Sequence, residues 1–130
     1  MARAIQPAAI RPPFAAYSHG ILVPAGADLL VTSGQLGVAA DDVVPEGAEA
    51  QCRLCFDNLA AILAEADMRF ADVIRFTAFV TDRAIFPIYG RVRAEYVAGD
   101  AFASTLVVVS GFTRPEFVVE VEVTAARRRT

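Results

Sequence analysis

The chain has 130 residues, of which 55% are hydrophobic, and its formal net charge is −3. This length is typical of one domain, so residues 1–130 are expected to fold as a single unit. An acidic chain has no basic footprint for nucleic acid, and no apolar run reaches the roughly 20 residues that a membrane-spanning helix needs. All 12 basic residues are arginine, which excludes a Schiff-base lysine and a P-loop lysine.

The N-terminal part is expected to be an irregular arm followed by a hairpin. Residues 1–16 are rich in alanine and proline and predict the arm. Residues 17–23 and 29–33 predict two strands, because a turn-forming segment rich in glycine and proline separates two apolar runs. Nothing at the N-terminus has the pattern of a signal peptide, so we expect a cytoplasmic protein.

A long helix and a strand follow. Apolar residues spaced three and four apart predict a helix over residues 48–66. Cys52 and Cys55 lie on its apolar face, so we interpret them as core residues rather than as a redox or metal motif. Two-residue alternation predicts a strand over residues 73–81.

The C-terminal part predicts one more helix and two strands. Asp82 is a suitable N-cap for a helix that ends by Gly99. Residues 104–109 and 117–125 predict the last strands, and residues 127–130 predict a solvated tail. The order β-β-α-β-α-β-β indicates a two-layer α+β domain.

The last predicted strand has two different faces. Its residues Phe117, Val119, Val121 and Val123 are expected to pack on the helices, whereas Glu120 and Glu122 lie on the other face. Arg75 and Thr77 lie in the same way on the strand over residues 73–81. This second face is either half exposed to solvent or buried against other subunits.

Several short motifs occur in the order and at the spacing of one known family. They are Ala-Tyr-Ser-His-Gly at 16–20, Thr-Ser-Gly-Gln at 32–35, Asp-Asn-Leu at 57–59, Phe-Val-Thr-Asp at 79–82 and Val-Glu-Val-Glu at 119–122. Together they resemble the RidA (YjgF/YER057c/UK114) family over residues 12–126. The resemblance implies a chorismate-mutase-like fold and a homotrimer, in which three sheets form a barrel and a small-molecule pocket lies at each subunit interface.

The resemblance also implies the composition of that pocket. RidA proteins hydrolyse reactive enamines and imines, and the carboxylate that holds their attacking water matches Glu120. Tyr17 matches a tyrosine that orients the substrate, and Ser33 and Gly34 match a turn that lines the pocket. The structural alternatives are an ion pair with Arg75 for Glu120, core packing for Tyr17, and turn formation alone for Ser33.

Three positions depart from the family pattern at the substrate end of the pocket. The arginine that binds the substrate carboxylate falls at Thr105, a helix asparagine falls at Gly90, and a cysteine falls at Val107. An arginine–carboxylate pair makes two parallel charged hydrogen bonds, whereas threonine offers one neutral hydroxyl. We therefore expect weak or no activity on imino acids of the 2-aminoacrylate type. Either the substrate lacks this carboxylate, or Arg114 or Arg91 replaces the missing cation.

Two functions remain open from the sequence, and a third, action on RNA as described for some members of the family that the chain resembles, is disfavoured by the acidic charge. The first is a hydrolase or deaminase that uses Glu120 and water on a non-standard imine or enamine. The second is a trimer that binds a small metabolite without catalysis. His19 is an additional acid–base candidate because its ordinary pKa is close to neutrality. No metal, organic cofactor, nucleic acid or membrane is expected as a partner.

Overall fold

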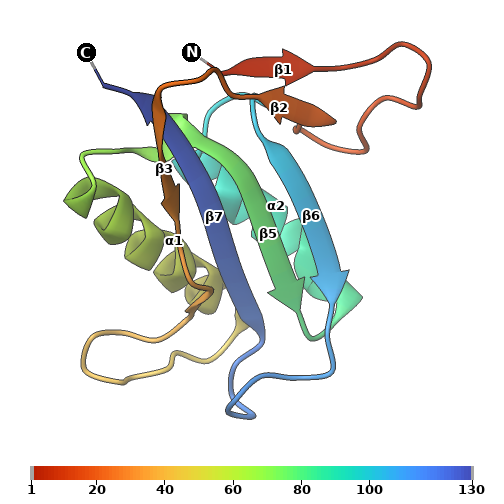
Figure 1. Ribbon diagram of the computed structural model, residues 1–130. Helices are drawn as coiled ribbons and strands as arrows, with labels where there is room; N and C mark the ends of the chain where they lie inside the picture. The colour runs from red at the N-terminus through yellow and green to blue at the C-terminus, as the bar shows by residue number, and fades with distance from the viewer. Residues whose placement is uncertain (1, 130) are drawn as a thin grey trace.

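A computed structural model describes residues 2–129 as one mixed sheet with two helices on one face, and a two-stranded ribbon at one end (Figure 1). The long helices and the main strands lie close to their predicted positions. The elements are β1 (Arg3–Ile5), β2 (Gly20–Leu22), β3 (Ala27–Val31), β4 (Gln35–Leu36), α1 (Ala48–Glu65), β5 (Val73–Val80), α2 (Phe86–Tyr96), β6 (Ala103–Val108) and β7 (Val119–Arg128), with short 3-10 turns at Phe70–Asp72 and Arg83–Ile85.

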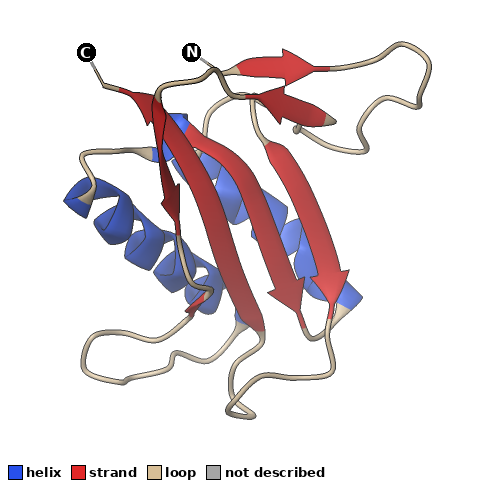
Figure 2. Cartoon of the chain, in the orientation of Figure 1, coloured by secondary structure: helices blue, strands red, loops and turns tan. Residues whose placement is uncertain are grey.

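The main sheet has the strand order β3-β7-β5-β6, and β4 also pairs with β7. The β5–β6 pair is parallel and is connected through α2, whereas β7 is antiparallel to β5, β3 and β4. Figure 2 shows both helices on the same side of this sheet, so its other side is open in the single chain. The predicted two-layer α+β fold is confirmed.

The core lies between the helices and the sheet. Phe56 of α1 is fully buried and contacts the rings of Tyr89 and Tyr96 on α2, at centroid distances of 5.8 and 5.2 Å. Burial of one such side chain contributes about 1.5–3 kcal/mol. Cys52 and Cys55 are also fully buried on α1, which confirms their interpretation as core residues. The predicted inward face of β7 is buried as expected.

The predicted arm and hairpin are wrong. Residues 3–5 form β1, which pairs antiparallel with β2, and Leu22 lies opposite Arg3. β3 pairs with β7 instead of with β2. The physical reason is that the backbone groups of β1 and β3 find partners far away in the chain, which local apolar patterns do not reveal.

The predicted C-terminal tail is also wrong for most of its length. β7 continues to Arg128 because Ala27 and Asp28 of β3 supply backbone partners for Arg128 and Arg127. Arg129 pairs with Asp28 at 2.9 Å. The last residue of the predicted tail, Thr130, lies outside the described residues. Within residues 2–129, no helix combines the length and the apolar character needed to cross a bilayer.

Candidate functional site

Glu120 lies on the open face of the sheet, close to the start of β7. It faces Leu36 of β4 on one side and Phe79 of β5 on the other. Alternation along β7 turns Val119 and Val121 toward the helices and leaves Glu120 half-buried on the other face. The carboxylate therefore projects from a rigid central strand, which is a suitable support for a catalytic group.

The turn between β3 and β4 lies directly against this carboxylate. A Cβ atom added to Gly34 would be 2.6 Å from Glu120 Cδ and 2.8 Å from its Oε2. Only glycine permits such a close approach. Gly34 and Glu120 are therefore neighbours, as the resemblance implies. Ser33 precedes Gly34 in the turn with an exposed side chain, and its carbonyl accepts a hydrogen bond from Gln35 Nε2 at 3.3 Å.

The environment of Glu120 changes its acidity. Burial raises the pKa of Glu120 above the ordinary value of a glutamate, and the nearby carboxylate of Glu122 raises it further. A higher pKa makes the carboxylate a stronger base for a proton from water. Among the described residues no ion pair joins Glu120 to Arg75. The β5–β7 register explains this, because Arg75 lies opposite Thr124.

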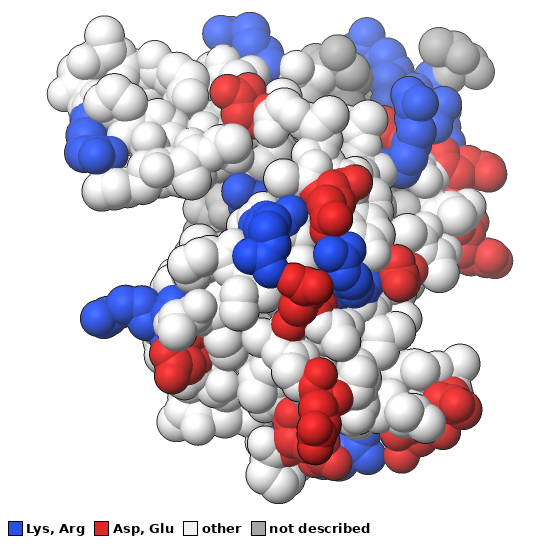
Figure 3. Space-filling view, turned by 180° about the vertical axis from the view of Figure 1, so that it is seen from behind, with Lys and Arg blue, Asp and Glu red and all other residues white. Residues whose placement is uncertain are grey.

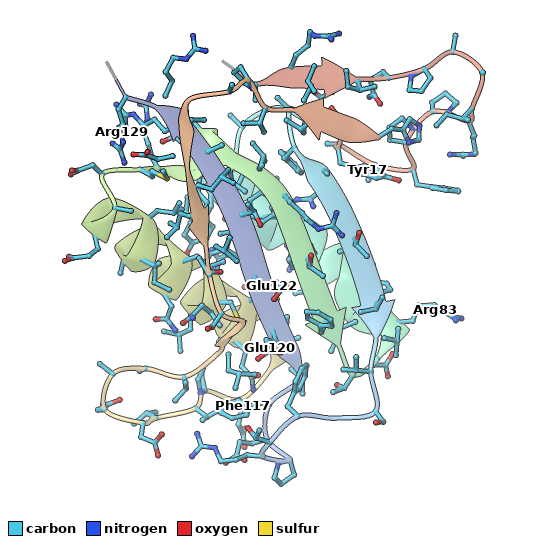
Figure 4. All side chains as sticks on the ribbon, in the orientation of Figure 1. Tyr17, Arg83, Phe117, Glu120, Glu122 and Arg129 are labelled. Carbon is cyan, nitrogen blue, oxygen red and sulfur yellow. The ribbon has the colours of Figure 1, made fainter. Side chains whose placement is uncertain are left out.

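Tyr17 lies at the other end of the sheet (Figure 4). Its ring packs against the edge of the core, and its hydroxyl accepts a hydrogen bond from the backbone N–H of Phe14 at 3.2 Å. The next residue, Ser18, is bonded through its backbone to Phe102, just before β6. Glu120 is level with Val107, and β6 rises about 16 Å from Phe102 to Val107. A single chain thus keeps Tyr17 and Glu120 apart.

A buried arginine attaches the Tyr17 segment to β6. Arg93 of α2 donates hydrogen bonds to Ser104 Oγ at 3.2 Å and to the Ala16 carbonyl at 3.4 Å. Its guanidinium carbon lies 4.9 Å from the centre of the Phe102 ring. Sequence reasoning missed Arg93, although a charged residue on the otherwise apolar side of α2 was the available signal.

Thr105 and Val107 lie on β6, which is an edge strand of the sheet, and both side chains are exposed. The Thr105 hydroxyl accepts a hydrogen bond from Arg75 Nη2 at 2.9 Å. Arg75 belongs to the neighbouring strand β5, so its side chain crosses from one strand to the next. The sequence suggests Arg114 and Arg91 as substitutes for the missing cation, whereas the cation that contacts Thr105 is Arg75.

Arg114 and Arg91 each have carboxylate partners. Arg114 forms an ion pair with Asp42 at 3.2 Å, and its guanidinium lies 4.7 Å from the centre of the Phe117 ring. Arg91 pairs with Glu49 on the helical layer, away from the open face of the sheet. Figure 3 shows arginines and acidic residues interspersed over that layer. Within the described residues of one chain, the hydrogen bonds of the Thr105 side chain involve neither arginine.

Two further candidates are also separated from Glu120. Gly90 lies in α2 on the helical side of the sheet, and a Cβ atom there would meet nothing within 4 Å. His19 is exposed on the loop before β2, and its Nε2 lies 2.6 Å from the Arg11 carbonyl. The candidates therefore lie at different heights of the sheet. Ser33, Gly34 and Glu120 lie together, Val107 is level with Glu120 two strands away on β6, and Tyr17 lies beyond the N-terminal end of β6.

Sequence and structure comparisons place the chain among known proteins. Residues 8–127 match the family model described as endoribonuclease L-PSP. The fold superimposes on YyfB from Yersinia pestis, of the conserved Rid protein family, with a TM-score of 0.83, 28% identity and coverage of 97% of this chain and 98% of that one. The chain belongs to the RidA family.

Two relatives of this chain come from Escherichia coli K12. The RutC family protein YjgH is 39% identical over 79 residues, which are 61% of this chain and 60% of YjgH. The 2-iminobutanoate/2-iminopropanoate deaminase is 34% identical over 93 residues, which are 71% of this chain and 65% of that enzyme. The chain thus matches less than two thirds of the length of either relative.

Proposed function

We propose that the protein is a RidA-like hydrolase that adds water to the carbon of a C=N bond in a small imine or enamine. The observation that carries this proposal is the half-buried carboxylate of Glu120, held against the Gly34 turn with a raised pKa. The family relationship and the deaminase among the relatives support the same class of reaction. We also expect a cytoplasmic location.

The reaction follows from these groups. Glu120 accepts a proton while the oxygen of a water molecule bonds to the imine carbon, and the electron pair of the C=N bond moves to nitrogen. The nitrogen takes up a proton, which gives the carbinolamine. The hydroxyl proton then moves to the nitrogen as the C=O bond forms and the C–N bond breaks, which leaves a carbonyl compound and free ammonia or amine. An enamine first takes a proton on carbon to become the imine. Each cycle consumes one water, and the proton taken by Glu120 is returned to the leaving nitrogen.

We propose that the pocket forms between subunits of a homotrimer. Two features of the chain support this assembly. Tyr17 and Glu120 lie at opposite ends of the sheet, so a pocket that uses both needs a second copy. Both sheet edges also carry exposed apolar residues: Val31 on β3 is 73% exposed, and Val108 on β6 is 49% exposed. Such edges are normally covered by another element or subunit.

Thr105 restricts the substrate of this proposed enzyme. Its hydroxyl, which accepts a hydrogen bond from Arg75, offers a substrate one neutral donor, whereas an arginine there would offer charged hydrogen bonds that contribute about 1.5–3 kcal/mol each. We therefore expect weak or no turnover of imino acids of the 2-aminoacrylate type, because without a cation at position 105 their C=N carbon is misaligned with the water at Glu120. Suitable substrates are imines or enamines that lack this carboxylate or carry it at another position relative to the C=N carbon.

The test is turnover of simple imines generated in situ, with and without a carboxylate. Glu120→Gln keeps the size of the side chain but cannot accept the proton, so turnover should fall by about 100-fold or more. Glu46→Gln, an exposed loop position, is the matched control and should behave like wild type. Turnover that survives in Glu120→Gln contradicts the proposal, and wild-type binding without turnover indicates a metabolite-binding trimer.

A further inference from the structure

The charge of Arg75 has no acidic partner in the described chain. Its Nη2 donates to Thr105 Oγ1 at 2.9 Å and its Nε donates to Thr77 Oγ1 at 3.2 Å. Among the described residues, the ion pairs with carboxylates use other arginines. Two neutral hydroxyls therefore fix the orientation of the guanidinium without compensating its charge.

The surroundings of Arg75 are concave. Together with Thr77 and Glu122 it lines a hollow of about 140 Å³ on the open face, whose other lining residues are Val31, Thr32, Val123 and Thr124. The hollow has room for a small ligand group only. Glu122 has no ion pair with Arg75 within residues 2–129. Its carboxylate repels any anion in the hollow, and the repulsion grows with the charge of the ligand, so a single negative charge is tolerated best.

We propose that Arg75 binds the carboxylate of a small monoanionic ligand, from β5, at the open face beside Thr105. A guanidinium presents a planar set of N–H donors that matches a carboxylate. The Thr77 and Thr105 hydroxyls restrict the side chain before the ligand arrives, so less conformational entropy is lost on binding. The identity of the ligand as an imine rests on the proposed function, whereas the anion site itself does not.

The position of Arg75 has a consequence for specificity. It is one strand away from Thr105, and neighbouring strands lie about 4.8 Å apart. The Nη2 atom of Arg75 nevertheless reaches the Thr105 hydroxyl, so the guanidinium approaches a ligand at β6 from the side of β5. This direction of approach orients the carboxylate differently from an arginine that starts on β6, and it therefore affects which imines place their C=N carbon at the water beside Glu120.

The test uses pyruvate, a stable oxo analogue of an imino acid, and its uncharged methyl ester. Both are titrated into the ¹⁵N-labelled full chain and followed by NMR at low salt. We expect wild type to bind pyruvate at least about tenfold more tightly than the ester, because a charged hydrogen bond is lost in the ester. Arg75→Gln should remove this preference. Arg75→Lys should keep part of it, since the charge remains but the planar donors do not.

Two controls separate the anion site from other effects. Arg83→Gln changes the net charge equally at an exposed arginine that points away from the sheet (Figure 4) and should bind like wild type. The double variant Arg75→Gln/Thr105→Arg returns the cation to β6 and should regain the preference. If Arg75→Gln disturbs folding, Thr105→Val is used instead. This variant keeps the charge of Arg75 but removes the hydrogen bond from its guanidinium to Thr105, so it should weaken pyruvate binding by several-fold.

Unchanged pyruvate binding in folded Arg75→Gln, or equal binding of acid and ester by wild type, would overturn the proposal. A result in which pyruvate binds through Arg75 while no imine is hydrolysed has a different meaning. It would contradict the proposed hydrolase and leave the anion site intact, so the two proposals fail separately.

Discussion

Replacing Gly34 by alanine is expected to damage catalysis without unfolding the protein. The new Cβ would lie 2.6 Å from Glu120 Cδ and 2.8 Å from both Cγ and Oε2. Non-bonded carbon atoms settle about 3.5–4.0 Å apart, so the carboxylate must move by about 1 Å. A displacement of about 1 Å at a catalytic group costs about 100-fold in rate. We therefore predict that kcat/KM falls by about 100-fold in Gly34→Ala.

The stability of the variant should change little. The clash involves the end of a flexible side chain, and the φ angle of Gly34 is outside the positive range that would strain alanine. Loss of backbone freedom in the unfolded chain even favours alanine by about 0.4–1 kcal/mol. Imine turnover and urea unfolding are measured on the same sample. Gly111→Ala is the matched control, because nothing lies within 4 Å of a Cβ there. Turnover within about threefold of wild type would refute the reasoning about Glu120.

Three further predictions concern single groups. The acid limb of kcat/KM should lie above the ordinary glutamate pKa, because burial and Glu122 raise the pKa of Glu120, and Glu122→Gln should move it to lower pH. Because the pKa of Glu120 is higher in the folded than in the unfolded protein, its ionised carboxylate destabilises the fold as the pH rises through that pKa. Glu120→Gln should therefore be more stable than wild type against urea at pH 7, and this difference should disappear in acid. Burial raises the pKa of Cys52 to about 11, so a thiol reagent should modify it only on unfolding. Fast labelling of native protein, or equal acid limbs for wild type and Glu122→Gln, would contradict these expectations.

Periodicity in the sequence predicted the elements that are stabilised by local patterns and a buried face. The helix predicted over residues 48–66 is observed as Ala48–Glu65, and the strand predicted over residues 73–81 as Val73–Val80. β1 was missed because three residues in an alanine- and proline-rich segment have no periodic pattern, and their pairing with β2 spans a long loop. β4 has only two residues and is defined by its pairing with β7.

The candidate site was predicted in part for a similar reason. Gly34 and Glu120 were proposed as neighbours through the family resemblance, and the close approach of the two agrees with it. Arg75 was interpreted only as a partner of Glu120, because the register of β5 against β6 and β7 is not visible in the sequence. That register places Thr77 beside Thr105 and brings the Arg75 side chain to the Thr105 hydroxyl.

The most direct test of the account asks whether one site uses two chains. Glu120→Gln and Tyr17→Phe are each expected to be inactive or nearly so, and the two are unfolded together and refolded in equal amounts to form mixed trimers. If each pocket combines Tyr17 of one copy with Glu120 of another, about a quarter of the pockets contain both native residues. The account predicts that about a quarter of the wild-type turnover returns in the mixture. A mixture with only the average activity of the two variants would contradict a site shared between subunits.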